Sequence, residues 1–474
     1  MSFKMTTLGE YAKIQGGFAY KSKDFIGASE YRVLKIKNVR FGTIDYSEPA
    51  FVPKNIAEST INWKLKEGDI LISMTGSGPN APQSLVGRVA RVWKNEPDAW
   101  FNQRVGRINL VDNKKIHPDF IFYWLSLPQN QDFLVANSSG SANQANISGK
   151  TIESLPTPIV DYEISSAIAK IARELDEKII LNTQINQTLE QIAQAIFKSW
   201  FVDFDPVKAK IEALAAGGSA DDAELAAMSV ISFKALDELS ILKASNPEAF
   251  NKLAQTAALF PAAMQDSELG EIPEGWEVSE IGNEVIVVGG GTPSTKNTEF
   301  WEDGTIHWTT PKDMSGLNCK VLTNTDRKIT EAGLKKISSG LLSKNTVLMS
   351  SRAPVGYLAL AKIPVAINQG YIAMKCEGRL SPEYVLLWCE HNMEEIKQRA
   401  SGTTFAEISK ANFKPIPVIV PTKSIIDTFT VQVSDIYNIV HANVLQSETL
   451  SISRDLLLPQ LLSGELSDVF KDGE

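Results

Sequence analysis

The chain has 474 residues, of which 43% are hydrophobic and 22% are charged, a composition typical of globular rather than disordered proteins. Its length exceeds that of one ordinary hydrophobic core and predicts two or more domains. No stretch of eighteen apolar residues is present, the first residues lack the apolar segment of a signal peptide, and the three cysteines lack disulfide or zinc spacing, so we expect a reducing cytoplasm.

The net charge of −9 is distributed over four blocks of alternating sign. Residues 1–158 carry +5 and residues 280–420 carry +2, whereas residues 159–279 carry −11 and residues 421–474 carry −5. If the chain binds DNA, the two basic blocks would neutralise the phosphates. Charge differs between segments in many proteins, so this pattern alone does not identify a DNA-binding protein.

Read from the N-terminus, the first part of the chain is repeated in the second. In each copy, short apolar runs between Gly, Pro and Asn predict strands and turns, and short helices follow at 118–127 and 382–400. Five pairs of segments match in the same order, namely 15–23 with 289–297, 68–78 with 345–355, 101–110 with 367–376, 117–125 with 381–389, and 138–158 with 400–418. This order predicts two copies of one fold.

Each copy is followed by a long stretch without Gly or Pro, 162–204 and 422–458, which predicts a long helix. A seven-residue repeat runs through both helices, at Ile168, Leu175, Asn182, Leu189 and Ile196 in the first and at Phe429, Ile436, Asn443, Leu450 and Leu457 in the second. We expect the companion positions of this seam at Ile171, Ile185 and Ile192, with Lys178 interrupting, and at the more polar Gln432, Ile439 and Gln446.

Asn182 and Asn443 interrupt the two seams at corresponding positions, midway along each helix. A buried Asn lowers the stability of a coiled coil but specifies its register, and antiparallel helices would bring these two residues together. At about 1.5 Å per residue, some thirty-five residues would form a rigid spacer on the order of 50 Å long. The alternative is two unrelated amphipathic helices, each packed on its own domain.

The sequence lacks a convincing catalytic constellation. The four histidines are isolated, no Walker-type loop is present, and Gly289–Gly291 is followed by neither a helix nor a suitably spaced acidic residue, so we interpret it as a turn. Asp203, Asp205 and Pro206 only faintly resemble an amino-methyltransferase motif. We therefore expect no catalytic residues and no metal site in this chain.

Two segments carry a family resemblance. IFKSWFVDFDPVKAKIEAL (196–214) resembles the end of the central helix of type I restriction-modification specificity subunits, and ELGEIPEGWEVSEIG (268–282) resembles the entry to their second target-recognition domain. LLPQLLSGEL (457–466) is the matching end of the second helix, and residues 207–236 resemble a longer linker found in one branch of the family.

The resemblance implies an α+β fold, in which two β-rich target-recognition domains are related by a pseudo-two-fold internal repeat and joined by two long antiparallel helices. The expected segments are 1–158 and 271–420 for the two domains, 159–214 and 421–474 for the long helices, and 215–270 for a helical linker. Each domain would read one half of a split DNA site, and the helices would set the unread spacer.

The resemblance also implies partners. The helices would dock methyltransferase subunits, two of them by the symmetry of the repeat, and restriction subunits would join the assembly. S-adenosylmethionine, ATP and Mg would belong to those partners, because the target adenine is flipped into the methyltransferase. Two alternatives stay open: a scaffold with two modules that bind protein or glycan, and a fragment of a fused methyltransferase-nuclease.

Polar loops that the repeat duplicates supply the candidate DNA-binding residues. Lys and Arg would mostly hold phosphates, whereas Asn, Gln and Arg can also reach base edges. The candidates in the first domain are Lys21, Lys23, Lys35, Lys37, Asn38, Arg40, Ser77, Asn102, Gln103, Arg104, Ser141, Asn143 and Gln144. Those in the second are Thr292, Ser294, Lys296, Thr309, Lys312, Asp313, Arg352, Asn368, Gln369, Thr403 and Thr404.

The aromatic residues Trp200, Phe201 and Phe204 follow the first heptad seam. They would either form the core of the helical stem or, as exposed aromatics at its end, suit a partner surface.

Overall fold

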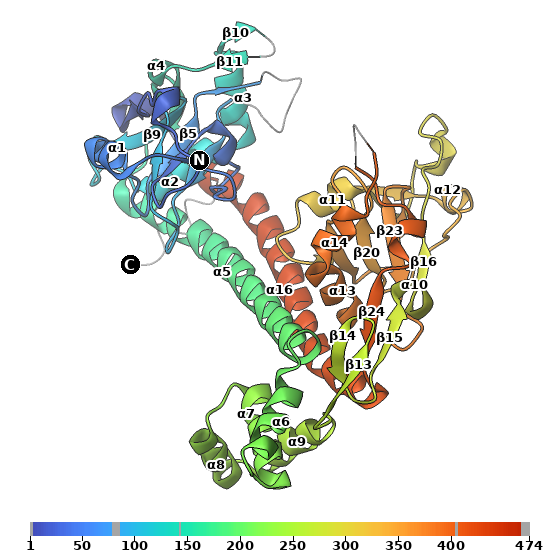
Figure 1. Cartoon of the computed structure of the whole chain (residues 1–474). Coiled ribbons are helices and arrows are strands. Elements are labelled where there is room, and N and C mark those ends of the chain that lie inside the picture. The colour runs from blue at the N-terminus through green and yellow to red at the C-terminus, as the bar shows by residue number, and fades with distance from the viewer. Residues whose placement is uncertain (1–2, 78–85, 142–143, 403–405, 466–474) are drawn as a thin grey trace. The chain divides into compact units, whose positions relative to one another are not determined.

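The computed structural model describes residues 3–77, 86–141, 144–402 and 406–465 (Figure 1). The chain forms two compact units, one from residues 1–179 with 449–474 and one from residues 180–448. It leaves the first unit within helix α5 (Tyr162–Phe201) and returns to it within helix α16 (Lys423–Ser463). Each unit therefore contains one copy of the repeated domain together with parts of both long helices.

The first domain is built on a four-stranded antiparallel sheet in the order β2-β9-β5-β7 (Ala12–Gly16, Val105–Leu110, Ile70–Ser73, Val89–Arg91). A second sheet has the order β4-β3-β8 (Ala50–Phe51, Arg32–Leu34, Ala99–Phe101), with β3 and β8 parallel. Two small sheets complete it: β1-β12 (Met5–Thr7, Pro156–Pro158) and β10-β11-β6 (Ser139–Ser141, Gln144–Asn146, Thr75–Gly76).

The second domain repeats this topology. Its main sheet has the order β16-β23-β20-β21-β18 (Ile286–Val288, Tyr371–Lys375, Val347–Ser350, Leu358–Ala361, Val321–Leu322). The sheet β19-β17-β22 (Arg327–Ile329, Ile306–Thr309, Ala366–Ile367) again has one parallel pair, β17 with β22. The pair β15-β24 (Glu277–Glu280, Pro417–Val420) corresponds to β1-β12, so the predicted internal repeat and the α+β class are confirmed.

Short helices cover these sheets at corresponding places. Helix α2 (Pro118–Ser126) matches α13 (Pro382–His391), and both begin with Pro in the first turn behind a capping side chain, His117 or Ser381. Most of each helix is buried because it packs against its domain's main sheet. The remaining short helices of the two domains are α1 (Lys54–Ser59), α3 (Pro128–Ala136), α4 (Gly149–Glu153), α10 (Ile281–Glu284), α11 (Pro311–Ser315), α12 (Glu331–Leu334), α14 (Met393–Gln398) and α15 (Lys410–Phe413).

Within the second unit, helices α5 and α16 are antiparallel and meet in a polar layer (Figure 1). The Asn182 Nδ2 atom donates to Gln446 Oε1 at 2.9 Å and to Ser447 Oγ at 3.1 Å. The Asn443 Nδ2 atom donates to Asn186 Oδ1 at 2.9 Å. The prediction that antiparallel packing brings Asn182 and Asn443 together is confirmed.

The companion positions of the seam were predicted wrongly. In α5 the side chains of Ile185 and Ile192 are 36% and 44% exposed, whereas Asn186 and Ala193, one residue further on, are buried. In α16 Ile439 is likewise exposed and Val440 is buried. At these three places the buried companion residue lies four positions after the seam residue rather than three. Ala172 and Ala193 are small and give a weak hydrophobic signal, which is why the neighbouring isoleucines misled the prediction.

The aromatic residues at the end of α5 are core residues of the second unit rather than an exposed partner surface. Trp200, Phe201 and Phe204 are 2%, 3% and 8% exposed. The ring of Phe201 lies 4.9 Å from those of both Tyr384 and Phe429, centroid to centroid. Aromatic pairs at this distance stabilise the core beyond simple burial, so this cluster joins the helix end to the second domain.

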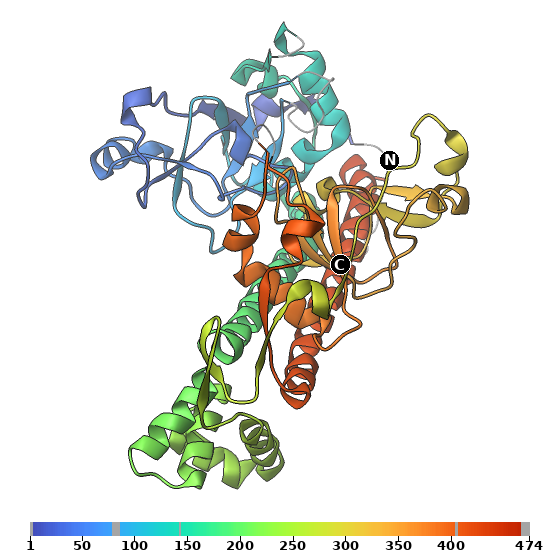
Figure 2. The same ribbon diagram turned by 45° about the vertical axis from the view of Figure 1, so that its right-hand side comes forward.

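Four helices follow α5 and form a small bundle, seen in both views (Figure 2). They are α6 (Asp205–Ala215), α7 (Ala220–Ser232), α8 (Leu236–Ser245) and α9 (Pro247–Ala258). Their own core contains the buried residues Ala227, Met228, Leu239 and Ala257. A hairpin, β13-β14 (Met264–Ser267, Gly270–Pro273), then leads to the second domain. The segment expected as a helical linker is thus a packed helical insert.

In the part of the chain that the structure describes, no helix is both long and apolar enough to cross a membrane.

Candidate nucleic-acid interface

In both domains the turn after the first strand of the main sheet lies directly against neighbouring backbone. A Cβ atom added at Gly17 would lie 2.1 Å from the carbonyl oxygen of Asn102, and one added at Gly290 would lie 1.9 Å from that of Ile367. Both distances are far shorter than a van der Waals contact, so only glycine fits. Backbone packing therefore explains the glycine run at 289–291 as a turn.

Three segments of the first domain converge at the end of strand β5. The Met74 amide donates to the carbonyl of Arg104 at 2.9 Å, and the Ile147 amide donates to the carbonyl of Met74 at 3.0 Å. The candidates Gln103, Arg104 and Gln144 lie in these segments with exposed side chains. The fold thus brings together candidate residues that are far apart in the sequence.

The second domain has the same convergence at the end of strand β20. The Ser351 amide donates to the carbonyl of Gly370 at 2.8 Å, and the Ile408 amide donates to the carbonyl of Ser351 at 3.0 Å. The candidates Arg352 and Gln369 lie here, half-buried and exposed respectively. Both domains therefore present a polar surface at the same place in the repeated fold.

Arginine side chains at these two places are held by neighbouring side chains. In the first domain, Arg104 Nη1 donates to Thr75 Oγ1 and to Asn146 Oδ1, both at 3.1 Å. In the second, Arg352 Nη1 lies 3.6 Å from Glu407 Oε2 in an ion pair. Two hydrogen bonds therefore restrain the orientation of Arg104, whereas Arg352 is paired only with a neighbouring carboxylate. Neither guanidinium group is buried.

The basic candidates at residues 21–40 lie in a separate loop region of the first domain. Lys21 and Lys23 are exposed, and the Lys35 ammonium group lies 4.1 Å from the centre of the Phe25 ring. Lys37 forms an ion pair with Glu48 at 2.8 Å and lowers the pKa of that carboxyl.

Arg40 forms an ion pair with Asp45 at 3.1 Å. Burial opposes ionisation of Asp45, but hydrogen bonds from Ser47 and the pair with Arg40 outweigh it and lower the pKa of Asp45. The charges of Lys37 and Arg40 are thus already partly neutralised within the domain.

The candidates Asn38 and Thr309 are buried, and their side chains do not reach the surface. Asn38 is 1% exposed; its Oδ1 accepts from the amide of Lys35, and its Nδ2 donates to the carbonyl of Asp45. Thr309 is 0% exposed, and its hydroxyl group lies 2.9 Å from that of Tyr371. Both side chains brace loops, so we withdraw them as direct DNA contacts.

The Asn-Gln pair found in both copies also supports the loops through its backbone. The amide of Asn102 donates to Leu34, and that of Asn368 donates to Thr309, at 2.9 and 3.0 Å. Asn102 is 9% exposed, and Asn368 Oδ1 accepts from the amide of Gly370. The following glutamines, not the asparagines, face outward.

The other candidates of the second domain lie on neighbouring loops. Thr292 donates to Gln369 Oε1 at 2.6 Å, which joins the glycine turn to the Asn-Gln turn. Ser294 and Lys296 are exposed. Asp313 accepts from the amide of Thr310 and caps the start of helix α11, and Lys312 pairs with Asp326 at 3.5 Å.

Ser77 accepts a hydrogen bond from the Val86 amide through its carbonyl, and Ser141 ends strand β10. Asn143, Thr403 and Thr404 lie outside the described residues.

Three residues of the interface escaped the sequence analysis: Thr75, Asn146 and Glu407. Each was passed over because it has no recognisable motif and no matching residue type in the other copy. The repeat offers a signal, however. Asn146 and Glu407 both directly precede the matched Ile-Ser pair at 147–148 and 408–409. Comparing corresponding positions, instead of looking for shared residue types, would have found them.

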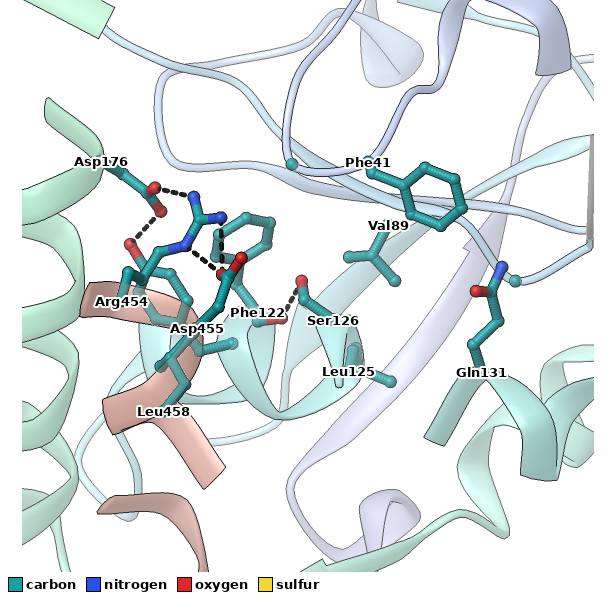
Figure 3. A pocket seen from close by; sticks show the side chains of 13 residues that line it. Phe41, Val89, Phe122, Leu125, Ser126, Gln131, Asp176, Arg454, Asp455 and Leu458 are labelled. Carbon is teal, nitrogen blue, oxygen red and sulfur yellow. Dashed lines mark hydrogen bonds and ion pairs between the residues drawn. The ribbon is translucent and has the colours of Figure 1, made fainter. Parts of the chain in front are cut away.

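A pocket of about 150 Å³ lies in the first unit (Figure 3). Tyr123 donates to Asp176 Oδ2 at 2.8 Å, and Arg454 from α16 pairs with the same carboxylate. The apolar part of the lining comes from Phe41, Val89, Phe122, Leu125 and Leu458. Phe41 is 60% exposed at its edge, so this surface suits an apolar protein contact better than a phosphate.

Helix α5 carries an apolar stripe on its outer face. Leu181, Ile185 and Ile192 are 47%, 36% and 44% exposed, and their spacing of four and seven residues places them on one side of the helix. Helix α16 likewise exposes Leu445, Ile452 and Leu456. Apolar side chains repeated along a helix face are typical of contacts with another helix.

No group of three or more His, Cys, Asp or Glu side chains with the geometry of a metal site occurs among the residues that the structure describes.

A family profile described as type I restriction modification DNA specificity domain matches residues 2–191 and 273–438, which together span both domains. The chain is 36% identical over 358 residues to the type I restriction enzyme HindI specificity subunit of Haemophilus influenzae, covering 74% of this chain and 77% of that protein. It is 35% identical over 160 residues to the MjaIX specificity subunit of Methanocaldococcus jannaschii, covering 33% of this chain and 37% of that protein.

Among solved structures, the S subunit of a type I restriction-modification system from M. genitalium has a similar fold. The TM-score is 0.50 with 14% sequence identity, and the alignment covers 98% of this chain and 96% of that one.

Proposed function

Since this chain belongs to the family of type I restriction-modification specificity subunits, we propose that its two domains read the two halves of one split DNA site. Members of this family bind DNA and assemble with the other subunits of the system. The observation that carries the proposal is the equivalent convergence of loops in both domains, with Gln103 and Arg104 in one and Gln369 and Arg352 in the other. Such side chains can donate to base edges in the major groove.

The long helices would set the unread spacer between the half-sites and dock the methyltransferase subunits. Their continuity over 40 and 41 residues supports a rigid spacer. The exposed apolar stripes on α5 and α16 support docking, because each stripe would be removed from water by a partner helix. The internal repeat, which supplies one long helix per copy, supports two copies of the methyltransferase subunit.

We also propose that this chain has no catalytic activity of its own. S-adenosylmethionine, ATP and Mg would then be bound by the methyltransferase and restriction subunits. In this arrangement the chain contributes sequence recognition and spacing, whereas base flipping and methyl transfer take place in the partner.

The test is to co-express the chain with its methyltransferase subunit in an unmodified host and to map methylated adenines across the genome. We expect one motif with two short specific halves and a fixed gap. Methylation with a continuous, single-part motif would contradict two-domain reading. A soluble complex without new methylation would favour the alternative, a non-catalytic scaffold that binds protein or glycan.

A further inference from the structure

Strand pairing beside the convergent loops makes two positions of the first domain equivalent to two positions of the second. Asn146 is paired with Thr75 in the antiparallel sheet of the first domain. Glu407 is paired with Arg352 by an antiparallel bridge in the second. Asn146 therefore corresponds to Glu407, and Thr75 corresponds to Arg352.

A third position follows from the hydrogen bonds that anchor the Asn-Gln turn. The carbonyl of Arg104 accepts from Met74 in the first domain, and the carbonyl of Gly370 accepts from Ser351 in the second. Met74 and Ser351 directly precede Thr75 and Arg352, so Arg104 corresponds to Gly370. The three positions thus form one site in each domain, which we call the arginine triad: Thr75, Arg104 and Asn146 in the first domain, and Arg352, Gly370 and Glu407 in the second.

Each triad contains one arginine, but at different positions. In the first domain the arginine comes from the Asn-Gln turn, and in the second, where that turn has Gly370, it comes from the segment after β20. In both, the residue before the matched isoleucine holds the guanidinium group: Asn146 through its amide oxygen and Glu407 through its carboxylate. Direct sequence matching cannot detect this exchange, because the arginines do not align.

In the second domain, the chemistry of the triad favours base reading over phosphate binding. Glu407 carries a negative charge beside Arg352, which would repel a phosphate but leaves the guanidinium fork able to donate elsewhere. Arginine has five N–H donors in a rigid plane, and Arg104 is restrained through Nη1. A restrained guanidinium group loses less conformational entropy on binding.

We infer that Arg104 and Arg352 are the base-reading arginines of the two domains, each donating to the O6 and N7 atoms of a guanine in its own half-site. This inference rests on the proposed split-site function. It assigns one specificity-determining residue to each half of the site, and it predicts a guanine on one strand in each half.

The experiment maps methylated adenines for complexes that carry Arg104→Gln or Arg352→Gln. Each substitution should lower the discrimination at one guanine position roughly tenfold or more, in one half of the motif only. The other half and the gap should stay unchanged, which also shows that the variant is folded. The two variants should affect opposite halves.

Arg104→Lys and Arg352→Lys separate base reading from phosphate binding. Lysine keeps the charge but loses the two-pronged donor geometry, so these variants should also lose discrimination at the same positions. Full restoration of the motif by lysine would overturn the inference, because it would show that a positive charge at these positions is enough without the guanidinium fork. The matched controls are Lys13→Gln, which removes an exposed cation paired with Glu153, and Arg399→Gln, which removes a half-buried cation paired with Glu395. Both should leave the motif unchanged.

Different outcomes contradict the proposed split-site function and the arginine assignment. If the wild-type complex gives no two-part motif, the proposed function fails. If the wild type gives such a motif and the arginine variants leave both halves intact, only the arginine assignment fails.

Discussion

Asp119 shows how a single buried charge joins the parts of one unit. Its carboxylate is 4% exposed and accepts from Arg91 Nε at 2.7 Å and from Arg173 Nη1 at 3.1 Å. Arg91 ends strand β7 and Arg173 belongs to helix α5, so this residue connects the sheet, helix α2 and the long helix. In the second unit the corresponding Glu383 accepts from Ser434 Oγ of α16 at 3.1 Å. Both copies of the repeat therefore have a buried acidic residue at this position, but it pairs with arginines in the first copy and accepts from a serine in the second.

Replacing the Asp119 carboxylate should destabilise the folded chain. Asp119→Asn removes the negative charge and leaves two guanidinium groups facing each other, so we expect the free energy of unfolding to fall by about 3 kcal/mol. Urea unfolding of the full chain, monitored by near-ultraviolet circular dichroism, measures this free energy. Glu58→Gln, which breaks the exposed pair with Lys54, should have little effect. Equal losses for both variants would contradict the role of burial.

Glu96 provides a pH-dependent term in the first domain. Burial raises the pKa of Glu96 to about 7, although hydrogen bonds from the Trp93 amide and the Tyr46 hydroxyl oppose the shift. The folded state therefore binds the proton more tightly than the unfolded chain, whose carboxyl titrates near 4.5. Its contribution to stability is complete below that pH and is lost as the pH rises towards 7.

Glu96→Gln should remove this dependence. Between about pH 4.5 and 7, the free energy of unfolding of the wild type should decrease relative to that of the variant. Urea unfolding of both proteins at half-unit pH intervals measures the difference, which cancels the other titrating groups. A constant difference over this range would show that Glu96 titrates alike in the folded and unfolded states.

At the scale of elements, helix α5 has two faces with different roles. The inner face contains Asn182, Asn186 and Ala193 and packs within the second unit, whereas the outer face contains Leu181, Ile185 and Ile192. Heptad spacing predicts that a helix packs, but a helix with two candidate seams does not reveal which seam its own chain covers. Small residues on the inner face permit close approach of the helices, and this packing decides the question.

The outer face predicts a specific response to substitution. Ile185→Ser and Ile192→Ser together should leave the stability of the chain nearly unchanged, because both side chains are already substantially exposed. They should weaken association with the methyltransferase subunit roughly tenfold or more, as expected for apolar groups no longer buried on binding. Isothermal titration calorimetry or biolayer interferometry measures the affinity. Ile241→Ser, at a 66% exposed position in the helical insert, is the matched control.

At the scale of the whole molecule, the net charge of −9 is compatible with DNA binding because the charge is segregated along the chain. The basic excess lies in the segments that form the two domains, and the acidic excess lies in the helices and the insert. Phosphate contacts made by the domains would release counterions, and the affinity for DNA would then depend on salt.

We therefore expect the affinity of the assembled complex for a duplex with its split site to fall steeply between 50 and 200 mM salt, by roughly tenfold or more. Fluorescence anisotropy with a labelled duplex measures the slope, and a duplex of scrambled sequence provides the non-specific reference. A protein or glycan ligand would not produce duplex binding with this slope. Salt-independent binding would therefore favour the scaffold alternative.

The sequence by itself determined the repeat, the family and the two long helices, because these depend on local patterns. Alternating apolar runs specify strands, long stretches without Gly or Pro specify helices, and matching segments in the same order specify two copies of one fold. Even the meeting of Asn182 and Asn443 could be predicted, since it follows from equal position along two antiparallel helices.

Only the tertiary structure decided which polar residues face outward and which helix face is covered. Asn38 and Thr309 are polar residue types that usually lie on the surface, yet both are buried in the folded loops. Asn38 accepts a hydrogen bond from a backbone amide, and the Thr309 hydroxyl group lies within hydrogen-bond distance of that of Tyr371. Arg104 and Arg352 do not align in sequence, and only the pairing of distant segments shows that they lie in corresponding sites at different positions. Burial and pairing are properties of residues brought together from far apart in the chain, and no local pattern encodes them.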